Sequence, residues 1–260
     1  MLGAIAGDII GSVYEGSSPG FREFLLFSSR ATFTDDTVMT VAVASALLDG
    51  RDYESEFLAW GRRYPGAGYG YRFSRWLADP ARSPTDSFGN GSAMRVSPVG
   101  WAFADLVEVG VQARASAMPS HGHPEGIGGA QAVAAAIHSA RRGASKTRIA
   151  EVIAGYGHDT TLTLEEQRAR GWVGVTCRET VPAATVAFLH STDFEDAVRI
   201  AVSLGGDTDT TACITGAMAE AYYGGVPPAI ESEVRDRLDA PLLDVVDRFR
   251  ARFVALTVNE

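Results

Sequence analysis

The residues best suited to chemistry gather in two short acidic stretches, each directly before an apolar run. The first is Thr-Asp-Asp-Thr at residues 34–37, and the second is Asp-Thr-Asp-Thr-Thr at residues 207–211. The runs that follow, residues 38–48 and 212–223, predict buried helices, so each acidic stretch lies in a first helical turn. Acidic and hydroxyl side chains there cap free N–H groups and suit the positive end of the helix dipole. One helix cap needs only one such side chain, whereas each stretch supplies several. We therefore predict that the two stretches meet in space.

Bringing these stretches together would create a cation site. Asp35, Asp36, Asp207 and Asp209 would place their negative charges in one region, which is costly and raises the carboxylate pKa values unless a cation compensates. One or two divalent cations would do so, and all-oxygen ligands that include threonine hydroxyls favour Mg²⁺, Mn²⁺ or Ca²⁺ over zinc. A binuclear site can orient substrate hydroxyls and activate a water molecule. Two well-capped helices without metal are the alternative. That alternative explains one stretch taken alone better than it explains the two stretches together.

The N-terminal segment carries glycines at positions 3, 7 and 11, which share one face of a predicted helix. Each costs about 1 kcal/mol relative to alanine in a helix interior, so close packing against another helix, or a ligand near the backbone, is the expected compensation. Asp8 lies beside this face, and we interpret it as a buried acceptor for N–H groups of a neighbouring loop rather than a catalytic residue.

Glu15 follows this helix, at the mouth of a loop of Gly, Ser and Pro at residues 16–20. An acidic residue at a loop edge is usually a solvated charge. The composition of the loop, and its position before the first acidic stretch, make a lid conceivable.

A Gly-Asn-Gly turn at residues 89–91 leads into a predicted short helix. Such a turn can cradle a phosphate through exposed N–H groups, although most are only turns. Arg95 could pair with a phosphate or with Asp86. His121 and His123 have a metal-ligand spacing, but they lie on a loop without a third soft ligand nearby. We therefore expect His121 to be structural or to contact substrate rather than to bind zinc.

Composition limits the class of protein. The chain has 260 residues, 46% of them hydrophobic, which suits one large domain or two small ones with a sizeable core. A net charge of −9 without any basic cluster argues against a nucleic-acid-binding surface. Cys177 and Cys213 form no metal-type pair and predict core packing in a reducing compartment. The apolar N-terminus lacks a basic region and is interrupted by Asp8, and no clean membrane span is found, so we expect a cytoplasmic protein.

Apolar residues recur at helical spacing along the chain, and strong period-two alternation is hard to find. We therefore predict an all-α protein of roughly ten or more helices, organised as a single compact domain over residues 1–260. Besides the helices already named, the pattern predicts helices at residues 53–63, 102–117, 127–139, 149–155, 183–190 with Thr180 as cap and Pro182 in the first turn, 194–203, 229–238 and 242–256. It also predicts a polar helix or linker at 161–171, and at 65–76 a stretch rich in Gly and Tyr that forms irregular surface structure or a wall of a pocket.

A set of motifs occurs in the order seen in ADP-ribosylglycohydrolases, namely GAIAGDIIGSVYE at residues 3–15, FTDDT at 33–37, SFGNGSAMR at 87–95, SH at 120–121 and GGDTDT at 205–210. The resemblance runs from residue 3 to about residue 224. The family includes the dinitrogenase reductase-activating glycohydrolase and the ADP-ribosylhydrolases that act on arginine and serine. It implies an all-α fold with a central cleft that holds two Mg²⁺ or Mn²⁺ ions.

The resemblance also implies particular roles for residues. The implied metal ligands are Thr34, Asp35, Asp36, Asp207, Asp209 and Thr210, with Asp209 bridging. The implied substrate contacts, to the pyrophosphate and ribose of ADP-ribose, are Ser87, Phe88, Gly89, Asn90, Gly91, Met94 and His121. Glu15 matches the flap glutamate of the serine-type members, as acid/base residue or as the group that positions the nucleophilic water, and together with Asp36 it is the implied catalytic residue.

The implied reaction is hydrolysis of the glycosidic bond at C1″ of the distal ribose, through a transition state with oxocarbenium character. We expect an ADP-ribosylated protein as substrate and a monomeric enzyme. The loops at residues 64–86 and 156–172 would form the acceptor side of the cleft, so the leaving group stays open. Two other functions also remain open: a module that binds ADP-ribose or a nucleotide without turnover, and a two-metal nucleotide phosphohydrolase.

Overall fold

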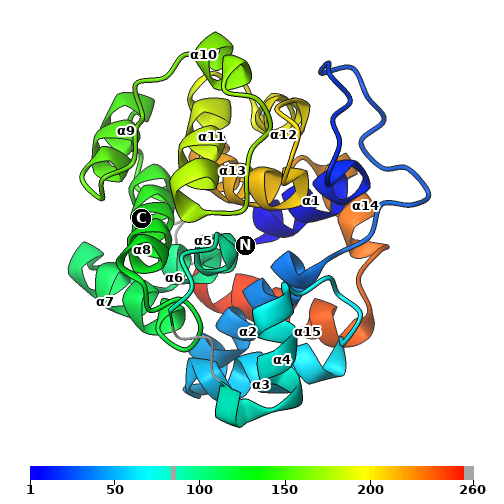
Figure 1. Ribbon diagram of the computed structural model, residues 1–260, viewed down its shortest axis with the longest axis vertical. Helices are drawn as coiled ribbons and strands as arrows, with labels where there is room; N and C mark the ends of the chain where they lie inside the picture. Colours follow the sequence, from blue (N-terminus) through cyan, green and yellow to red (C-terminus); the bar gives the residue numbers. More distant parts are fainter. Residues whose placement is uncertain (83–85, 255–260) are drawn as a thin grey trace.

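Helices form nearly all of the regular structure in the computed structural model, which describes residues 1–82 and 86–254 (Figure 1). Within those ranges the extended segments form only isolated bridges. The α-helices are α1 Leu2–Gly11, α2 Asp35–Asp49, α3 Tyr53–Arg63, α4 Tyr71–Ala78, α5 Gly91–Met94, α6 Ser97–Ala102, α7 Leu106–Ala117, α8 Pro124–Arg141, α9 Lys146–Ala154, α10 Leu164–Ala169, α11 Cys177–Leu189, α12 Phe194–Ser203, α13 Thr208–Tyr223, α14 Pro228–Arg235 and α15 Ala240–Phe249. The all-α prediction is confirmed.

The pair α1 and α13 forms the centre of the fold, with α11 and α12 on one side and α2, α3 and α15 on the other (Figure 1). The two helices run antiparallel and approach closely along the glycine face. A Cβ atom added at Gly7 would lie 2.0 Å from the carbonyl oxygen of Ala212, and one at Gly3 would lie 2.3 Å from that of Gly216. The prediction of close helix packing is confirmed. It brings the C-terminus of α1 beside the first turn of α13, where the Thr208 hydroxyl donates to the Gly11 carbonyl at 2.9 Å.

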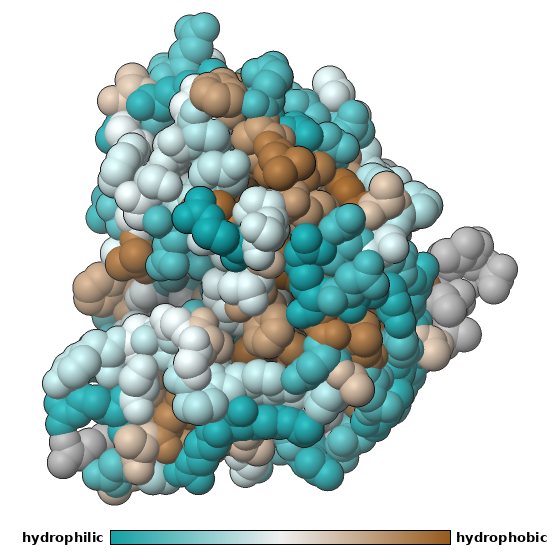
Figure 2. Space-filling view, turned by 90° about the vertical axis from the view of Figure 1, so that its right-hand side faces the viewer, coloured by the Kyte–Doolittle hydropathy of each residue, from teal (hydrophilic) through white to brown (hydrophobic). Residues whose placement is uncertain are grey.

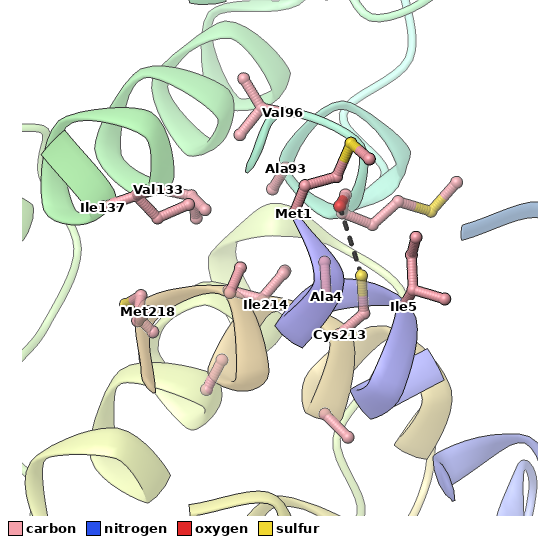
Figure 3. Packing of buried hydrophobic residues seen from close by; sticks show 14 of the residues in the cluster. Met1, Ala4, Ile5, Ala93, Val96, Val133, Ile137, Cys213, Ile214 and Met218 are labelled. Atoms are coloured by element: carbon pink, nitrogen blue, oxygen red, sulfur yellow. Dashed lines mark hydrogen bonds between the residues drawn. The ribbon is translucent and has the colours of Figure 1, made fainter. Parts of the chain in front are cut away.

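The apolar core continues around this pair. Figure 3 shows Ala4 and Ile5 of α1 packed with Ile214 of α13. On the far side, Val133 and Ile137 of α8 close the cluster. Both cysteines are buried and free, as expected from the sequence. This packing fixes the helix starts that carry the acidic residues.

Some element boundaries differ from the predictions. The stretch at 65–76 contains the start of α4, and the predicted helix 102–117 is interrupted, because α6 ends at Ala102 and α7 begins after the Asp105 cap. Thr180 is not a cap: α11 begins at Cys177, capped by Thr176. The C-terminal helix ends at Phe249 and continues as a π-helical turn to Val254; the last two positions of the prediction, 255 and 256, lie outside the described residues.

The surface in Figure 2 is mostly hydrophilic or neutral, with apolar patches gathered toward the middle of that face. None of the helices in the described part of the chain is both long and apolar enough to cross a membrane.

Candidate active site

The two acidic helix starts meet at one cavity of about 380 Å³. Asp35 and Asp36 in the first turn of α2 line it together with Asp207, Asp209 and Thr210 at the start of α13. The Thr210 hydroxyl donates to Asp36 Oδ2 at 3.4 Å, although the two residues are 174 positions apart. The predicted convergence of the two stretches is therefore found in the structure.

Asp8 of α1 holds the first helix start in place. Its fully buried carboxylate accepts from the backbone N–H of Thr34 and of Thr37, each at 3.0 Å, and from both threonine hydroxyls. The interpretation of Asp8 as a buried acceptor for loop N–H groups is borne out by these contacts. The Thr34 hydroxyl is used by Asp8 and by the capped N–H of Asp36, and Thr34 is not among the residues that line the cavity.

The carboxylates of the acidic cluster repel one another, and burial disfavours their charged forms. Burial, followed by repulsion from Asp8, raises the pKa of Asp35 to about 7. Burial and the charge of Asp209 hold the pKa of Asp36 well above its usual range, and burial with Asp207 does the same for the pKa of Asp209. Each of these carboxyl groups therefore favours its neutral form. A bound cation would stabilise the charged carboxylates and offset their mutual repulsion.

Two orphaned oxygen atoms agree with this cation interpretation. Asp36 Oδ1 and Asp209 Oδ1 are buried and have no hydrogen-bond partner among the described residues. Buried carboxylate oxygens without a donor are costly, and oxygen atoms of this kind are the ligands that Mg²⁺ and Mn²⁺ prefer. Within residues 1–82 and 86–254 no three His, Cys, Asp or Glu side chains form a ready-made metal-binding group. The fit to a divalent cation therefore rests on charge and orphaned oxygens rather than on a preformed coordination shell.

Glu15 lies at the rim of the same cavity. It follows the 3₁₀ turn Ser12–Tyr14, and the next residues pair with the strand-like segment before Asp207: Gly16 N–H donates to the Gly206 carbonyl at 2.9 Å, and Gly206 N–H donates to the Ser17 carbonyl at 3.1 Å. Glu15 is an exposed residue, yet partial burial and the nearby charge of Asp207 raise the pKa of its carboxyl group.

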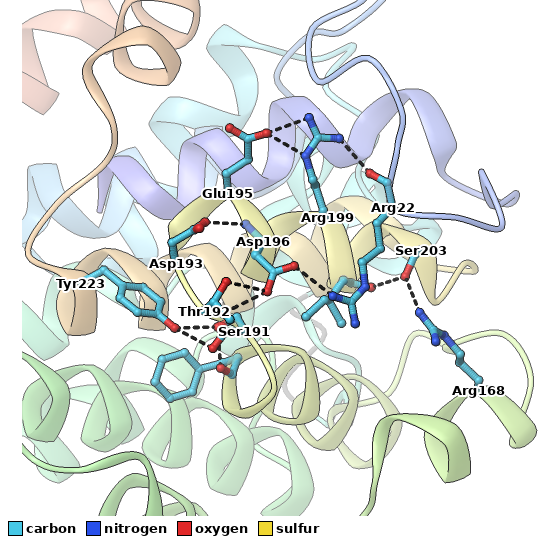
Figure 4. A network of polar contacts seen from close by, with 12 residues as sticks. Arg22, Arg168, Ser191, Thr192, Asp193, Glu195, Asp196, Arg199, Ser203 and Tyr223 are labelled. Carbon is cyan, nitrogen blue, oxygen red and sulfur yellow. Dashed lines mark hydrogen bonds and ion pairs between the residues drawn. The ribbon is translucent and has the colours of Figure 1, made fainter.

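The loop after Glu15 is also tied down further along. Arg22 pairs with Asp196 of α12 at 3.0 Å, and the Arg199 guanidinium donates to the backbone carbonyl of Arg22 (Figure 4). The same guanidinium donates to the backbone carbonyl of Phe24. The loop conceived as a lid thus has anchors at both ends in this structure. These anchors hold Glu15 beside Asp207.

The Gly-Asn-Gly turn forms another wall of the cavity and leads into the short helix α5, as predicted. The buried Asn90 amide donates to Asp207 Oδ2 at 2.6 Å and to the Thr180 hydroxyl at 2.9 Å, so it positions a carboxylate of the acidic cluster. Ser87 and Met94 also line the cavity. Phe88 does not; it is 49% exposed and its ring packs against His123.

Two arginines, Arg72 and Arg95, also line the cavity. Arg95 is fully buried there, with its guanidinium 4.0 Å from the Phe57 ring centroid, and His121 lies beside it. Asp86 pairs with Arg72, so the option of an Arg95–Asp86 pair is wrong. The cavity lining therefore combines acidic and basic side chains.

Sequence reasoning missed part of the wall. Tyr71 and Arg72 of α4 line the cavity, as does Gly68, where an added Cβ atom would lie 3.4 Å from Asp35 Oδ1. The Gly- and Tyr-rich composition suggested a pocket wall, but it held no signal for individual residues.

Comparisons with known proteins agree on one family. The sequence profile described as ADP-ribosylglycohydrolase matches residues 1–257. ADP-ribosylhydrolase ARH3 of Gallus gallus is 28% identical over an alignment that covers 89% of this chain and 86% of its own. ADP-ribosylarginine hydrolase Tri1 of Pseudomonas putida (strain GB-1) is 25% identical, with 88% and 71% covered. A solved structure, an ADP-ribosylglycohydrolase-related protein complex, superposes with a TM-score of 0.71 at 27% identity over 96% of each chain.

Proposed function

The chain belongs to the ADP-ribosylglycohydrolase family and is a glycohydrolase, and from this premise we propose that it is a metal-dependent enzyme that releases ADP-ribose from a modified protein side chain. The bond cleaved is the glycosidic bond at C1″. One observation carries the proposal: two acidic helix starts, distant in sequence, line one cavity below Glu15.

The acidic part of the lining would hold two divalent cations, Mg²⁺ or Mn²⁺. The ligands would be Asp35, Asp36, Asp207, Asp209 and Thr210, with Thr34 at the edge of the group. The two orphaned Oδ1 atoms and the raised pKa values of the cluster support this assignment. Bound cations supply Lewis-acid chemistry, orienting ribose hydroxyls and lowering the pKa of a water molecule.

Glu15 acts on protons at the reaction centre. Partial burial and the charge of Asp207 raise the pKa of its carboxyl group, which makes it a stronger base than an ordinary glutamate. In the proposed reaction its carboxylate accepts a proton from the attacking water, and the carboxylic acid can then return a proton to the departing acceptor atom. Asp36, whose buried Oδ1 has no hydrogen-bond partner among the described residues, is the second catalytic residue of the proposal.

The wall formed by the Gly-Asn-Gly turn would receive the diphosphate. Gly89, Gly91, Met94 and His121 line the cavity, and Arg95 adds the positive charge that an anionic substrate needs. Phe88, exposed outside the lining, could contact substrate only at the mouth.

A panel of mono-ADP-ribosylated substrates tests the proposal. Peptides modified on arginine and on serine, and ADP-ribosylated nucleic-acid ends, are incubated with and without Mg²⁺ and analysed by mass spectrometry. We expect release of intact ADP-ribose from at least one protein linkage, only with the metal. No release from any linkage contradicts the proposal. Tight ADP-ribose binding without turnover would identify a binding module, and release of phosphate or AMP would identify a phosphohydrolase.

A cytoplasmic monomer is the state we propose for the acting enzyme. The elution volume in size-exclusion chromatography checks the monomer directly.

A further inference from the structure

Arg95 is the most deeply buried cation at the candidate site. Its residue is 0% exposed, and burial lowers the pKa of its guanidinium to about 9. Its hydrogen bonds among the described residues go to neutral oxygen atoms, the Ser116 carbonyl and the Ser120 hydroxyl, both at 2.8 Å. A buried charge is expensive, so a guanidinium here without a carboxylate partner calls for an explanation beyond packing.

Ser120 links this cation to His121. The Ser120 hydroxyl lies 2.8 Å from Arg95 Nη2 and 2.7 Å from His121 Nδ1. A guanidinium can only donate, so the hydroxyl oxygen accepts from Arg95. Ser120 is fully buried, and within the described residues Nδ1 is the remaining partner for its single hydroxyl hydrogen. The hydroxyl therefore donates to Nδ1, and Nδ1 carries no proton.

The surroundings of His121 also oppose a charged ring. The residue is 8% exposed, and burial, with the positive charges of Arg95 and Arg72, lowers the pKa of the imidazole well below its usual value. A neutral ring with Nδ1 as acceptor carries its hydrogen on Nε2. The ring is thus one defined tautomer.

The Nε2 atom lies beside Gly89 and Gly91 of the cavity wall. His121 is one of the lining residues, and Nε2 has no hydrogen-bond partner in the part of the chain that the structure describes. A Cβ atom added at Gly91 would lie 3.0 Å from Nε2, so the glycine turn leaves just enough room for the ring in this position. The Nε2–H group is presented beside the Gly-Asn-Gly turn.

We propose that Arg95 and Ser120 are positioning residues that fix His121 as the Nε2–H tautomer, so that His121 donates a hydrogen bond to a phosphate oxygen of the substrate. The identification of the acceptor as a phosphate rests on the proposed function, because ADP-ribose brings an anionic diphosphate to this cavity. Arg95 acts through Ser120 on the ring and adds positive charge to the cavity lining. The tautomer itself follows from the contacts of the protein alone.

Nitrogen-15 NMR of histidine-labelled protein tests the tautomer without substrate. The signal of His121 is identified by its absence in His121→Gln. In the wild type we expect hydrogen on Nε2 and an unprotonated, hydrogen-bonded Nδ1 at neutral pH. Hydrogen on Nδ1 would overturn the proposal. This outcome does not depend on hydrolysis, so it separates failure of this inference from failure of the proposed function.

Calorimetry with ADP-ribose and Mg²⁺ tests the consequence for binding. Ser120→Ala should mix the tautomers and weaken ADP-ribose binding about tenfold, which is the size expected for one hydrogen bond to a charged acceptor. With a hydrolysable substrate, KM should rise by more than kcat falls. Ser116→Ala is the matched control, since that hydroxyl is equally buried but donates to the Ala113 carbonyl; both measurements should stay at wild-type values.

A double variant distinguishes positioning from simple packing. The side-chain amide of His121→Gln offers an N–H near the place of Nε2 and has no tautomer to fix. Adding Ser120→Ala to His121→Gln should therefore weaken binding much less than Ser120→Ala does in the wild type. Equal weakening in both backgrounds, or no change of tautomer in Ser120→Ala, overturns the proposal. Arg95→Lys, which keeps a cationic donor for Ser120, should retain the Nε2–H tautomer; should it fail to fold, the serine variants still decide.

Discussion

At the scale of single residues, Glu15 differs from every other acidic residue at the site. The aspartates are buried or half-buried at helix starts, whereas Glu15 is exposed at the rim and lies close enough to Asp207 for that charge to raise its pKa. Its backbone neighbours, and not its side chain, fix its place. A side chain with this freedom can be changed without disturbing the fold, which makes its role testable.

Replacing Glu15 by glutamine should lower kcat by at least about a hundredfold, because proton transfer by a positioned group typically contributes 10²–10⁴-fold. Affinity for Mg²⁺ and for ADP-ribose should change little, since the acidic cluster stays intact. Turnover and calorimetric binding are measured on the same preparation. Glu23→Gln, an exposed glutamate on the same loop, is the control and should keep full activity; equal turnover in both variants would remove Glu15 from the mechanism.

Residue types and their order correctly predicted the acidic cluster, the Gly-Asn-Gly turn and the role of Asp8 as a buried acceptor. They could not predict that the Asn90 amide holds Asp207, or that Arg95 contacts Ser120 rather than Asp86. Such pairings depend on which loop packs on which. The sequence contains the partners but not the distances between them.

At the scale of elements, the close contact of α1 with α13 sets the geometry of the site. It places Asp8 of α1 under the start of α2, and it brings the start of α13 to the end of α1. The glycine face that makes the contact possible is therefore part of the active-site scaffold, although no glycine of it lines the cavity.

Gly7→Ala should destabilise the protein by at least about 2 kcal/mol, because the added methyl would overlap the Ala212 carbonyl and force the helices apart. The free energy of unfolding in urea measures this. Gly110→Ala in α7 is the matched helical control. Its Cβ would meet only ordinary contacts at 3.9 Å, and helix propensity predicts stabilisation by up to about 1 kcal/mol. A similar change in both variants would contradict the role of the close contact.

Apolar periodicity located α3 and α12 with their observed ends, but it was weaker where composition is unusual. Glycines and tyrosines concealed α4, and the three residues between α6 and α7 carry no strong breaker. The start of α11 was misplaced because Pro182 suggested a first turn; the structure tolerates that proline inside the helix. Tertiary packing, which a local pattern does not contain, decides these cases.

At the scale of the whole molecule, the acidic cluster stores repulsion that should appear as a pH dependence of stability. The pKa of Asp35 rises to about 7 in the folded protein, against about 4 in an unfolded chain. The folded state therefore binds this proton more tightly, and stability without metal should fall as pH rises from about 4 to about 7.

Urea unfolding in a chelator, at intervals across that pH range, measures the effect. The difference in unfolding free energy between the wild type and Asp35→Asn isolates this carboxylate from other titrating groups. The stability of the variant relative to the wild type should increase as pH rises. Mg²⁺ at pH 8 should stabilise the wild type more than the variant. A difference that stays flat with pH, or changes in the opposite direction, would contradict the stored repulsion.

The central claim is that two helix starts far apart in sequence form one cation site. Titration of metal-free protein with Mn²⁺, followed by electron paramagnetic resonance and calorimetry, tests it most directly. We predict binding of two ions in the wild type, and loss of both the binding and ADP-ribose release in Asp36→Asn and, separately, in Asp209→Asn. Mn²⁺ binding and turnover that survive unchanged in either variant would contradict the claim.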